Sequence, residues 1–169
     1  RNQSFAVHLC FGVLRFYFVL QKALTALLHK PLKTKDKDLE LLMMVGLYQL
    51  FYTDTPQHAA INETVDAAHR IAPYAKGLVN AVLRNALRQF DDIKDILTHG
   101  NSQPAWLTAR WKKDWPNDWQ ALVAANQAHP PFVLRVNAQK TNREEYLGAL
   151  SEANIDAAPL AHSANGIAI

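Results

Sequence analysis

The chain has 169 residues, and its 18 Lys and Arg against 15 Asp and Glu give a net charge of +3. This length allows one ordinary domain, or a domain and part of another, with enough apolar sequence for a core. A balance this mildly basic does not by itself indicate a polyanionic partner, and the single cysteine excludes an internal disulfide framework and suits a cytoplasmic protein.

The first predicted element is one long buried helix from Phe5 to His29, which is almost continuously apolar. Its most apolar part is short for a bilayer crossing, contains Arg15 and lacks the features of a signal peptide, so we expect no membrane partner. Arg15, at the rim of this helix, either donates to a phosphate or pairs with a carboxylate. Cys10 is expected to be an inert thiol in the core.

The lysine-rich run from Lys30 to Lys37 resembles a nucleic-acid patch, but Asp36 and Asp38 interrupt it. We interpret it as a solvated loop in which one of these aspartates caps the following helix. Leu39 to Tyr52 is apolar nearly all round, which is typical of a central helix enclosed by its neighbours.

A turn then leads into a helix predicted from Gln57 to about Ile71, with Thr55 as its cap and Pro56 at its first position. His58 and His69 lie on this helix without the spacing of paired metal ligands. We therefore expect no metal site.

The stretch from Lys76 to Phe90 is predicted to be a helix with two opposite surfaces. Apolar residues recur at the spacing that buries one face, namely Leu78, Val79, Val82, Leu83, Ala86, Leu87 and Phe90. A polar row without an acidic residue follows the other face at intervals of four: Lys76, Asn80, Arg84 and Arg88. This row is the strongest candidate in the chain for contacts with phosphates.

Residues 98–104 have the composition of a linker, and we predict a domain boundary near residue 100. All four tryptophans follow between Trp106 and Trp119, interleaved with Arg110, Lys112 and Lys113. Aromatic and cationic side chains in this mixture can stack bases and bind phosphates. Packing of two short helices on the first domain would account for the tryptophans without any ligand, and we favour it.

The end of the chain is predicted to be the first part of a small α/β unit. Phe132, Leu134 and Val136 alternate with more polar positions, as in a strand with one buried face. Thr141 and Glu144 form a candidate capping box for a helix to about Ala153, and residues 165–169 resemble the entry to an unfinished strand.

Sequence signatures of catalysis are not found. The chain has no Gly-rich phosphate loop, no Cys/His metal spacing and no nucleophile elbow, and Cys10 has no neighbouring base. No catalytic residue is predicted, which leaves a binding or positioning role.

Several motifs, in one order, resemble the N-terminal part of the RsmB (Sun/Fmu) family of small-subunit ribosomal RNA cytosine-5 methyltransferases. In the first part of the chain they are residues 9–15 (LCFGVLR), 44–50 (MVGLYQL), 56–65 (PQHAAINETV) and 76–84 (KGLVNAVLR). In the second part they are residues 104–107 (PAWL) and 130–137 (PPFVLRVN). The resemblance implies that residues 1–100 form a NusB-like, all-α, RNA-binding helical bundle. Residues 101–169 would then hold two short linker helices and an incomplete, RRM-like α/β unit.

The resemblance also implies that the chain is a piece of a longer enzyme. The family's S-adenosylmethionine domain, with its two catalytic cysteines, would lie beyond Ile169, and the first helix of the bundle would lie before Arg1. The chain itself would bind no cofactor and be inactive alone, and its partners would be ribosomal RNA and the missing methyltransferase domain.

Three functions remain open at this point. The leading one is the RNA-positioning part of the methyltransferase, and the others are a free-standing NusB-type antitermination factor and a scaffold that does not touch RNA. For the first, the expected RNA contacts on the helical bundle are Lys76, Arg84, Arg88 and Arg15. Those beyond it are Arg110, Lys112, Lys113 and Arg135.

Overall fold

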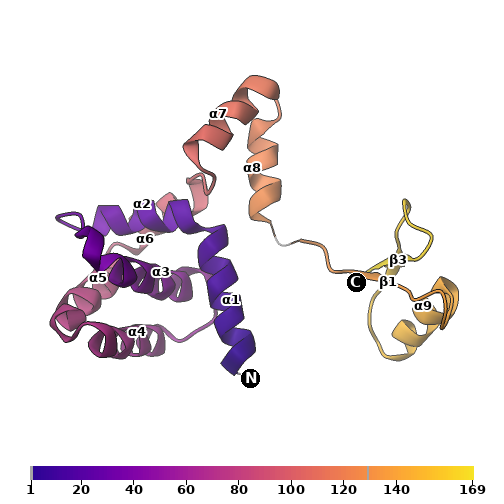
Figure 1. Cartoon of the computed structure of the whole chain (residues 1–169), viewed down its shortest axis with the longest axis horizontal. Helices are drawn as coiled ribbons and strands as arrows, with labels where there is room; N and C mark the ends of the chain where they lie inside the picture. The colour runs from indigo at the N-terminus through magenta and orange to yellow at the C-terminus, as the bar shows by residue number, and fades with distance from the viewer. Residues whose placement is uncertain (1, 129) are drawn as a thin grey trace. The chain divides into compact units, whose positions relative to one another are not determined.

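The computed structural model describes residues 2–128 and 130–169, and it is mainly helical, as predicted (Figure 1). The chain divides into two compact units, one reaching to Gln127 and the other beginning at Ala128. In the first unit the helices are α1 (Asn2–Arg15), α2 (Tyr17–Leu27), α3 (Lys37–Tyr52), α4 (Gln57–Ile71), α5 (Lys76–Arg88), α6 (Phe90–His99), α7 (Ala105–Asp114) and α8 (Trp119–Gln127). Short 3-10 turns at Thr34–Asp36 and Pro73–Ala75 precede α3 and α5. The predicted domain boundary near residue 100 falls between α6 and α7 and stays a prediction, because α7 and α8 cluster with the first unit.

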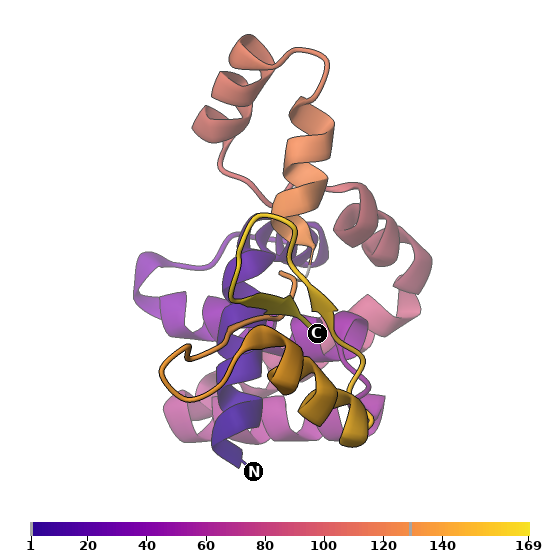
Figure 2. The same cartoon turned by 90° about the vertical axis from the view of Figure 1, so that its right-hand side faces the viewer.

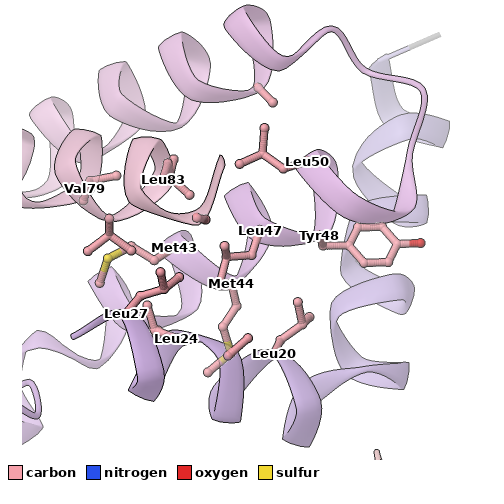
Figure 3. Packing of buried hydrophobic residues seen from close by; sticks show 14 of the residues in the cluster. Leu20, Leu24, Leu27, Met43, Met44, Leu47, Tyr48, Leu50, Val79 and Leu83 are labelled. Atoms are coloured by element: carbon pink, nitrogen blue, oxygen red, sulfur yellow. The ribbon is translucent and has the colours of Figure 1, made fainter. Parts of the chain in front are cut away.

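The central position predicted for α3 is confirmed, since it contacts α1, α2, α4 and α5. Met43, Met44 and Leu47 are fully buried between leucines of α2 and the apolar face of α5 (Figure 3). The helices approach closely at Gly46, where an added Cβ would lie 2.9 Å from a methyl group of Leu83. This packing fixes α5 with its polar face outward.

The prediction of one buried helix from Phe5 to His29 is wrong. α1 and α2 meet at an angle of 80° around Phe16, whose φ of −104° and ψ of 17° leave the helical region. The Phe16 ring stacks on Tyr52 of α3 with 4.3 Å between ring centroids, so a tertiary contact accompanies the bend. α1 exposes much of its apolar surface, and Cys10 is exposed rather than in the core.

The C-terminal end of α5 differs from the sequence-based expectation. The predicted helix to Phe90 ends at Arg88, and Phe90 begins α6, a helix that the sequence pattern did not indicate. α6 buries Ile93 and Leu97, while Asp91 and Asp92 complement the positive end of its dipole. Phe90 leaves the α5 face and stacks on Phe51 at 5.1 Å.

The predicted caps are also displaced. α4 has its predicted bounds, but Pro56 stands at the N-cap position and Thr55 makes no capping bond. The Asp36 side chain does not cap α3 and instead accepts a hydrogen bond from the Tyr74 hydroxyl at 2.8 Å. In each case another side chain engages the predicted capping group, since the Thr55 hydroxyl accepts from the Thr53 hydroxyl at 2.8 Å.

The second unit is a small α/β unit, as predicted, and its three-stranded antiparallel sheet has the order β1-β3-β2 (Figure 2). Its elements are β1 (Val133–Arg135), α9 (Arg143–Glu152), β2 (Ala158–Pro159) and β3 (Gly166–Ala168). Val133 and Ala158 both pair with Ala168, and Val136, Leu150 and Ile167 form the core. Phe132, predicted on the buried face, is 62% exposed.

The cap of α9 lies one residue later than predicted. Asn142 accepts a hydrogen bond from the Glu145 backbone N–H at 2.9 Å, and the Thr141 hydroxyl donates to the Glu145 carboxylate at 2.8 Å. The bond from Thr141 to the carboxylate, followed by hydrogen bonds from Asn142, lowers the pKa of Glu145.

Candidate nucleic-acid interface

The predicted polar row lies on the exposed side of α5. Lys76, Arg84 and Arg88 are exposed, while Val79, Val82, Leu83 and Ala86 are buried beneath them. Two amides of the same helix orient the guanidinium groups. Arg84 Nε donates to Asn80 Oδ1 at 2.9 Å, and Arg88 Nη2 donates to Asn85 Oδ1 at 3.3 Å. Gly77, next to Lys76, serves no close contact between helices, because an added Cβ there would meet no atom within 4 Å.

The row turns around the helix rather than running straight along it. Four residues advance an α-helix by about 400°, so each member of the row is displaced by about 40° from the one before. Lys76 and Arg88 therefore lie about 120° apart around the axis and about 18 Å apart along it. Such a stripe can follow the curved backbone of a nucleic acid. Only the Arg88 end of the row borders the groove described next.

Beside Arg88 lies a groove of about 710 Å³ between α5 and the loop after α2. Lys30 and Lys33 of this loop line the groove together with Arg88. The loop was predicted to be solvated, and both lysines are indeed exposed. The sequence alone did not place them near α5, because the loop and Arg88 are more than fifty residues apart in the chain.

The groove is lined by both apolar and positively charged side chains. Its apolar lining includes Leu28, Leu32, Leu78 and Val82. Asp36 is the one carboxylate among the described lining residues, against three cations, and its bond to Tyr74 raises the pKa of that phenol. Local charge here favours an anionic ligand.

Lys37, at the end of the same lysine run, has a different role. Its Nζ donates to Glu40 Oε1 at 2.8 Å and to the Tyr17 hydroxyl at 3.2 Å. The bond with Lys37 lowers the pKa of Glu40, and the bond with Glu40 raises the pKa of Lys37. Lys37 therefore joins α2 to α3 and is set apart from the lysines of the groove.

Arg15 stands at the C-terminal end of α1, where its charge complements the helix dipole. It is half-buried, and none of the ion pairs formed by the described residues includes it. The expected carboxylate partner is thus not found in the described part of the chain. A role for Arg15 in phosphate binding stays a prediction.

The cations among the tryptophans separate into two groups. Arg110 Nε lies 3.3 Å from Asp114 Oδ2, and Lys113 is exposed. Lys112 Nζ instead lies 4.4 Å from the centre of the Trp119 ring of α8. Packing does not account for all the tryptophans, since Trp106 is 69% exposed.

Arg135 belongs to the second unit and is exposed on β1. It lines a cavity of about 430 Å³ with Asn137, Gln139 and Asn165. An arginine beside three amides offers donors to phosphate and to base edges, but its RNA contact stays a prediction.

The described residues contain neither a metal-binding cluster nor a single helix able to span a membrane. No group of three or more His, Cys, Asp or Glu side chains there is arranged to hold a metal ion. No single described helix is long and apolar enough to cross a membrane, although the bent pair Gln3–Arg15 and Tyr17–Leu27 meets the length and composition together.

Comparison with known proteins assigns each part of the chain. Residues 1–88 match the model of the NusB family, and residues 103–169 match that of the RsmF/B-like methyltransferase ferredoxin-like domain. The chain is 43% identical over 174 residues to ribosomal RNA small subunit methyltransferase B of Pseudomonas syringae pv. tomato, covering 100% of this chain and 39% of that protein. It is 41% identical over 165 residues to the probable methyltransferase B of Coxiella burnetii, covering 95% of this chain and 38% of that protein. The chain thus spans about two fifths of the length of these relatives, and the resemblance read from the sequence motifs is confirmed.

Proposed function

The chain belongs to the NusB family, whose model matches residues 1–88, and we propose that it is the RNA-positioning part of a small-subunit ribosomal RNA methyltransferase. The match of residues 103–169 to an RsmF/B-like methyltransferase domain favours this function over a free-standing NusB-type factor. The proposed substrate is a cytosine of ribosomal RNA, to which S-adenosylmethionine would supply the methyl group. The proposed partners are that RNA and a methyltransferase domain.

The observation that carries the proposal is the convergence of Lys30 and Lys33 with Arg88 at one end of the α5 row. Together with Lys76 and Arg84, they give five cations on neighbouring parts of one bundle, although they come from two distant parts of the sequence. Each cation neutralises a phosphate and releases condensed counterions. Because Asn80 and Asn85 hold the two guanidinium groups, less side-chain entropy is lost when RNA binds.

In this mechanism the bundle recognises charge and shape rather than base sequence. Double-helical RNA presents phosphates and 2′-hydroxyls, whereas its deep major groove is closed to side chains. The cations fix the register of the RNA, and the target cytosine is thereby placed at a separate catalytic domain. The chain's contribution is to orient the substrate.

The described residues do not fit an S-adenosylmethionine site. A Gly-rich cofactor loop needs glycines close together, whereas the six glycines of this chain stand singly, at positions 12, 46, 77, 100, 148 and 166. No step of methyl transfer is therefore assigned to this chain.

The test is the affinity of the chain for a hairpin of small-subunit ribosomal RNA across a salt series. The double variant Arg84→Glu with Arg88→Glu is compared with a matched charge reversal elsewhere on the bundle, Lys22→Glu with Arg70→Glu. Each lost phosphate contact reduces the slope of log affinity against log salt by about 0.7 to 0.9, so the first pair is expected to reduce it by about 1.4 to 1.8. An unmeasurable affinity for the parent chain, or equal losses in both double variants, would refute the RNA-positioning function.

A scaffold is the second candidate, and the surface of α1 favours it. Phe11 is 65% exposed and Leu14 is 68% exposed, a pattern suited to packing against another protein surface. In the same salt series a scaffold gives no specific RNA binding, so one experiment separates the two functions.

A further inference from the structure

α7 exposes a large aromatic side chain that the fold does not use. Trp106 is 69% exposed and stands in the first turn of the helix, while Trp111 and Trp119 are half-buried. A tryptophan side chain gains more from burial against a partner than most other side chains do. An exposed indole can stack on a flat ligand, and cations beside it attract a negatively charged one.

Helix geometry places two cations on the same face of α7 as Trp106. Arg110 lies one turn further along and Lys113 two turns further, about 40° and 20° to either side of the Trp106 direction. Arg110 is paired with Asp114, the one acidic residue of α7, which lies one turn beyond Arg110 on the side away from Trp106. The remaining charge near the indole is positive. We define Trp106, Arg110 and Lys113 as the Trp106 face.

The other half of the helix is used for packing. Lys112 lies over the Trp119 ring at 4.4 Å, a cation–π contact that joins α7 to α8. Trp115, which is 51% exposed, follows the last residue of α7 and stands at the opposite end of the helix from Trp106. The chain thus supplies its own control, an exposed tryptophan that is not part of the Trp106 face.

We propose that the Trp106 face binds an unpaired segment of RNA, with one base stacked on the indole and adjacent phosphates at Lys113 and Arg110. The proposal rests on the RNA-positioning function and deepens it by naming the form of RNA that this face selects. Stacking needs a free base face, which a duplex does not present, and it tolerates any base because each has a π surface. The α5 row and groove, in contrast, read phosphates in either form of RNA.

The test compares the affinity of the whole chain for an unstructured, labelled RNA oligonucleotide with its affinity for a fully paired hairpin, by fluorescence anisotropy. Loss of one stacked base weakens binding by about five- to a hundred-fold, so Trp106→Ala is expected to lose at least fivefold on the unstructured RNA. Binding to the hairpin should stay within about twofold, since no stacking contact is removed there. Trp106→Phe keeps a π surface and should recover most of the affinity, while Trp115→Ala should leave it nearly unchanged.

Circular dichroism and thermal unfolding establish that each variant is folded. Lys113→Ala is a second variant of the Trp106 face, and it tests RNA affinity with every tryptophan in place. The proposal is overturned if Trp106→Ala and Trp115→Ala weaken binding equally, or if Trp106→Ala affects both RNAs alike. It is also overturned if neither Trp106→Ala nor Lys113→Ala affects the unstructured RNA. In that last case, if the affinity of the parent chain for RNA still falls steeply with salt, only the Trp106 proposal is refuted. If the parent chain binds neither RNA, the RNA-positioning function is refuted as well.

Discussion

The contact of α1 with α3 depends on Gly12, and replacement of this glycine by alanine gives the sharpest test of the bundle's packing. A Cβ built on Gly12 would overlap two ring atoms of Tyr48, Cζ and Cε1, and its hydroxyl oxygen. Tyr48 is 5% exposed, so its ring cannot move freely. It lies 5.3 Å from the Tyr52 ring and 5.8 Å from His8, and it points from the core toward α1 (Figure 3).

Two opposing effects set the size of the change. Alanine is favoured over glycine inside a helix by about 1 kcal/mol, whereas overpacking of a tight contact costs about 1 to 3 kcal/mol. Because the overlap involves ring atoms held by stacking, we take the upper part of that range and expect a net destabilisation of about 2 kcal/mol. Gly77→Ala is the control, since open space surrounds Gly77 and the substitution should stabilise by up to about 1 kcal/mol.

Urea unfolding of the chain measures both changes, and a double-mutant cycle isolates the cause. In a Tyr48→Leu background the ring is gone, so Gly12→Ala should become neutral or stabilising, with a coupling of about 2 kcal/mol or more. Stabilisation by Gly12→Ala in the parent chain, or an unchanged cost in the Tyr48→Leu background, would show that α1 does not dock on α3 as described.

Three further predictions follow from the groove, a cap and a buried phenol. Lys30→Glu and Lys33→Glu should each lower the salt slope of RNA binding by about 0.7 to 0.9, whereas Lys35→Glu, with the same charge change outside the groove, should not. Asn142→Ala should lower the free energy of unfolding of the second unit by about 1 kcal/mol in thermal melts, with recovery in Asn142→Ser; no loss would show that the cap is dispensable. Burial raises the pKa of Tyr52 from 10.0 to about 12, so the folded state favours the neutral phenol. The stabilisation of the fold by this phenol is fully present below pH 10.0 and is lost as the pH rises to about 12. After allowance for partial exposure this alkaline loss is about 1 kcal/mol, and it should be absent in Tyr52→Phe; equal alkaline unfolding of both proteins would contradict the assignment.

Local periodicity was sufficient where one element buries one clear face. The bounds of α4 and the exposed row of α5 were readable from residue spacing, because an amphipathic pattern determines both the helix and its orientation. The enclosed position of α3 was readable because its sequence is apolar nearly all round. The family resemblance was readable too, since several motifs occur in one order.

Local patterns failed where distant contacts compete with them. The run from Phe5 to His29 is apolar on both sides of Phe16, so nothing in its composition indicates a bend of 80°. The stacking of Phe16 on Tyr52 is a contact across 36 residues and is visible only after folding. α6 was missed because its first turn is acidic and its buried residues, Ile93 and Leu97, show a single helical interval.

The sequence by itself therefore determined the helical class, the family and the acid-free row from Lys76 to Arg88. Only the tertiary structure decided which other cations join that row. Lys30 and Lys33 line the groove beside Arg88, while Lys37 of the same run is held by Glu40 and Lys112 by Trp119. The physical reason is that the sequence shows only which cations are close along the chain. A phosphate is bound by cations that are close in space, and the packing of the helices sets those distances.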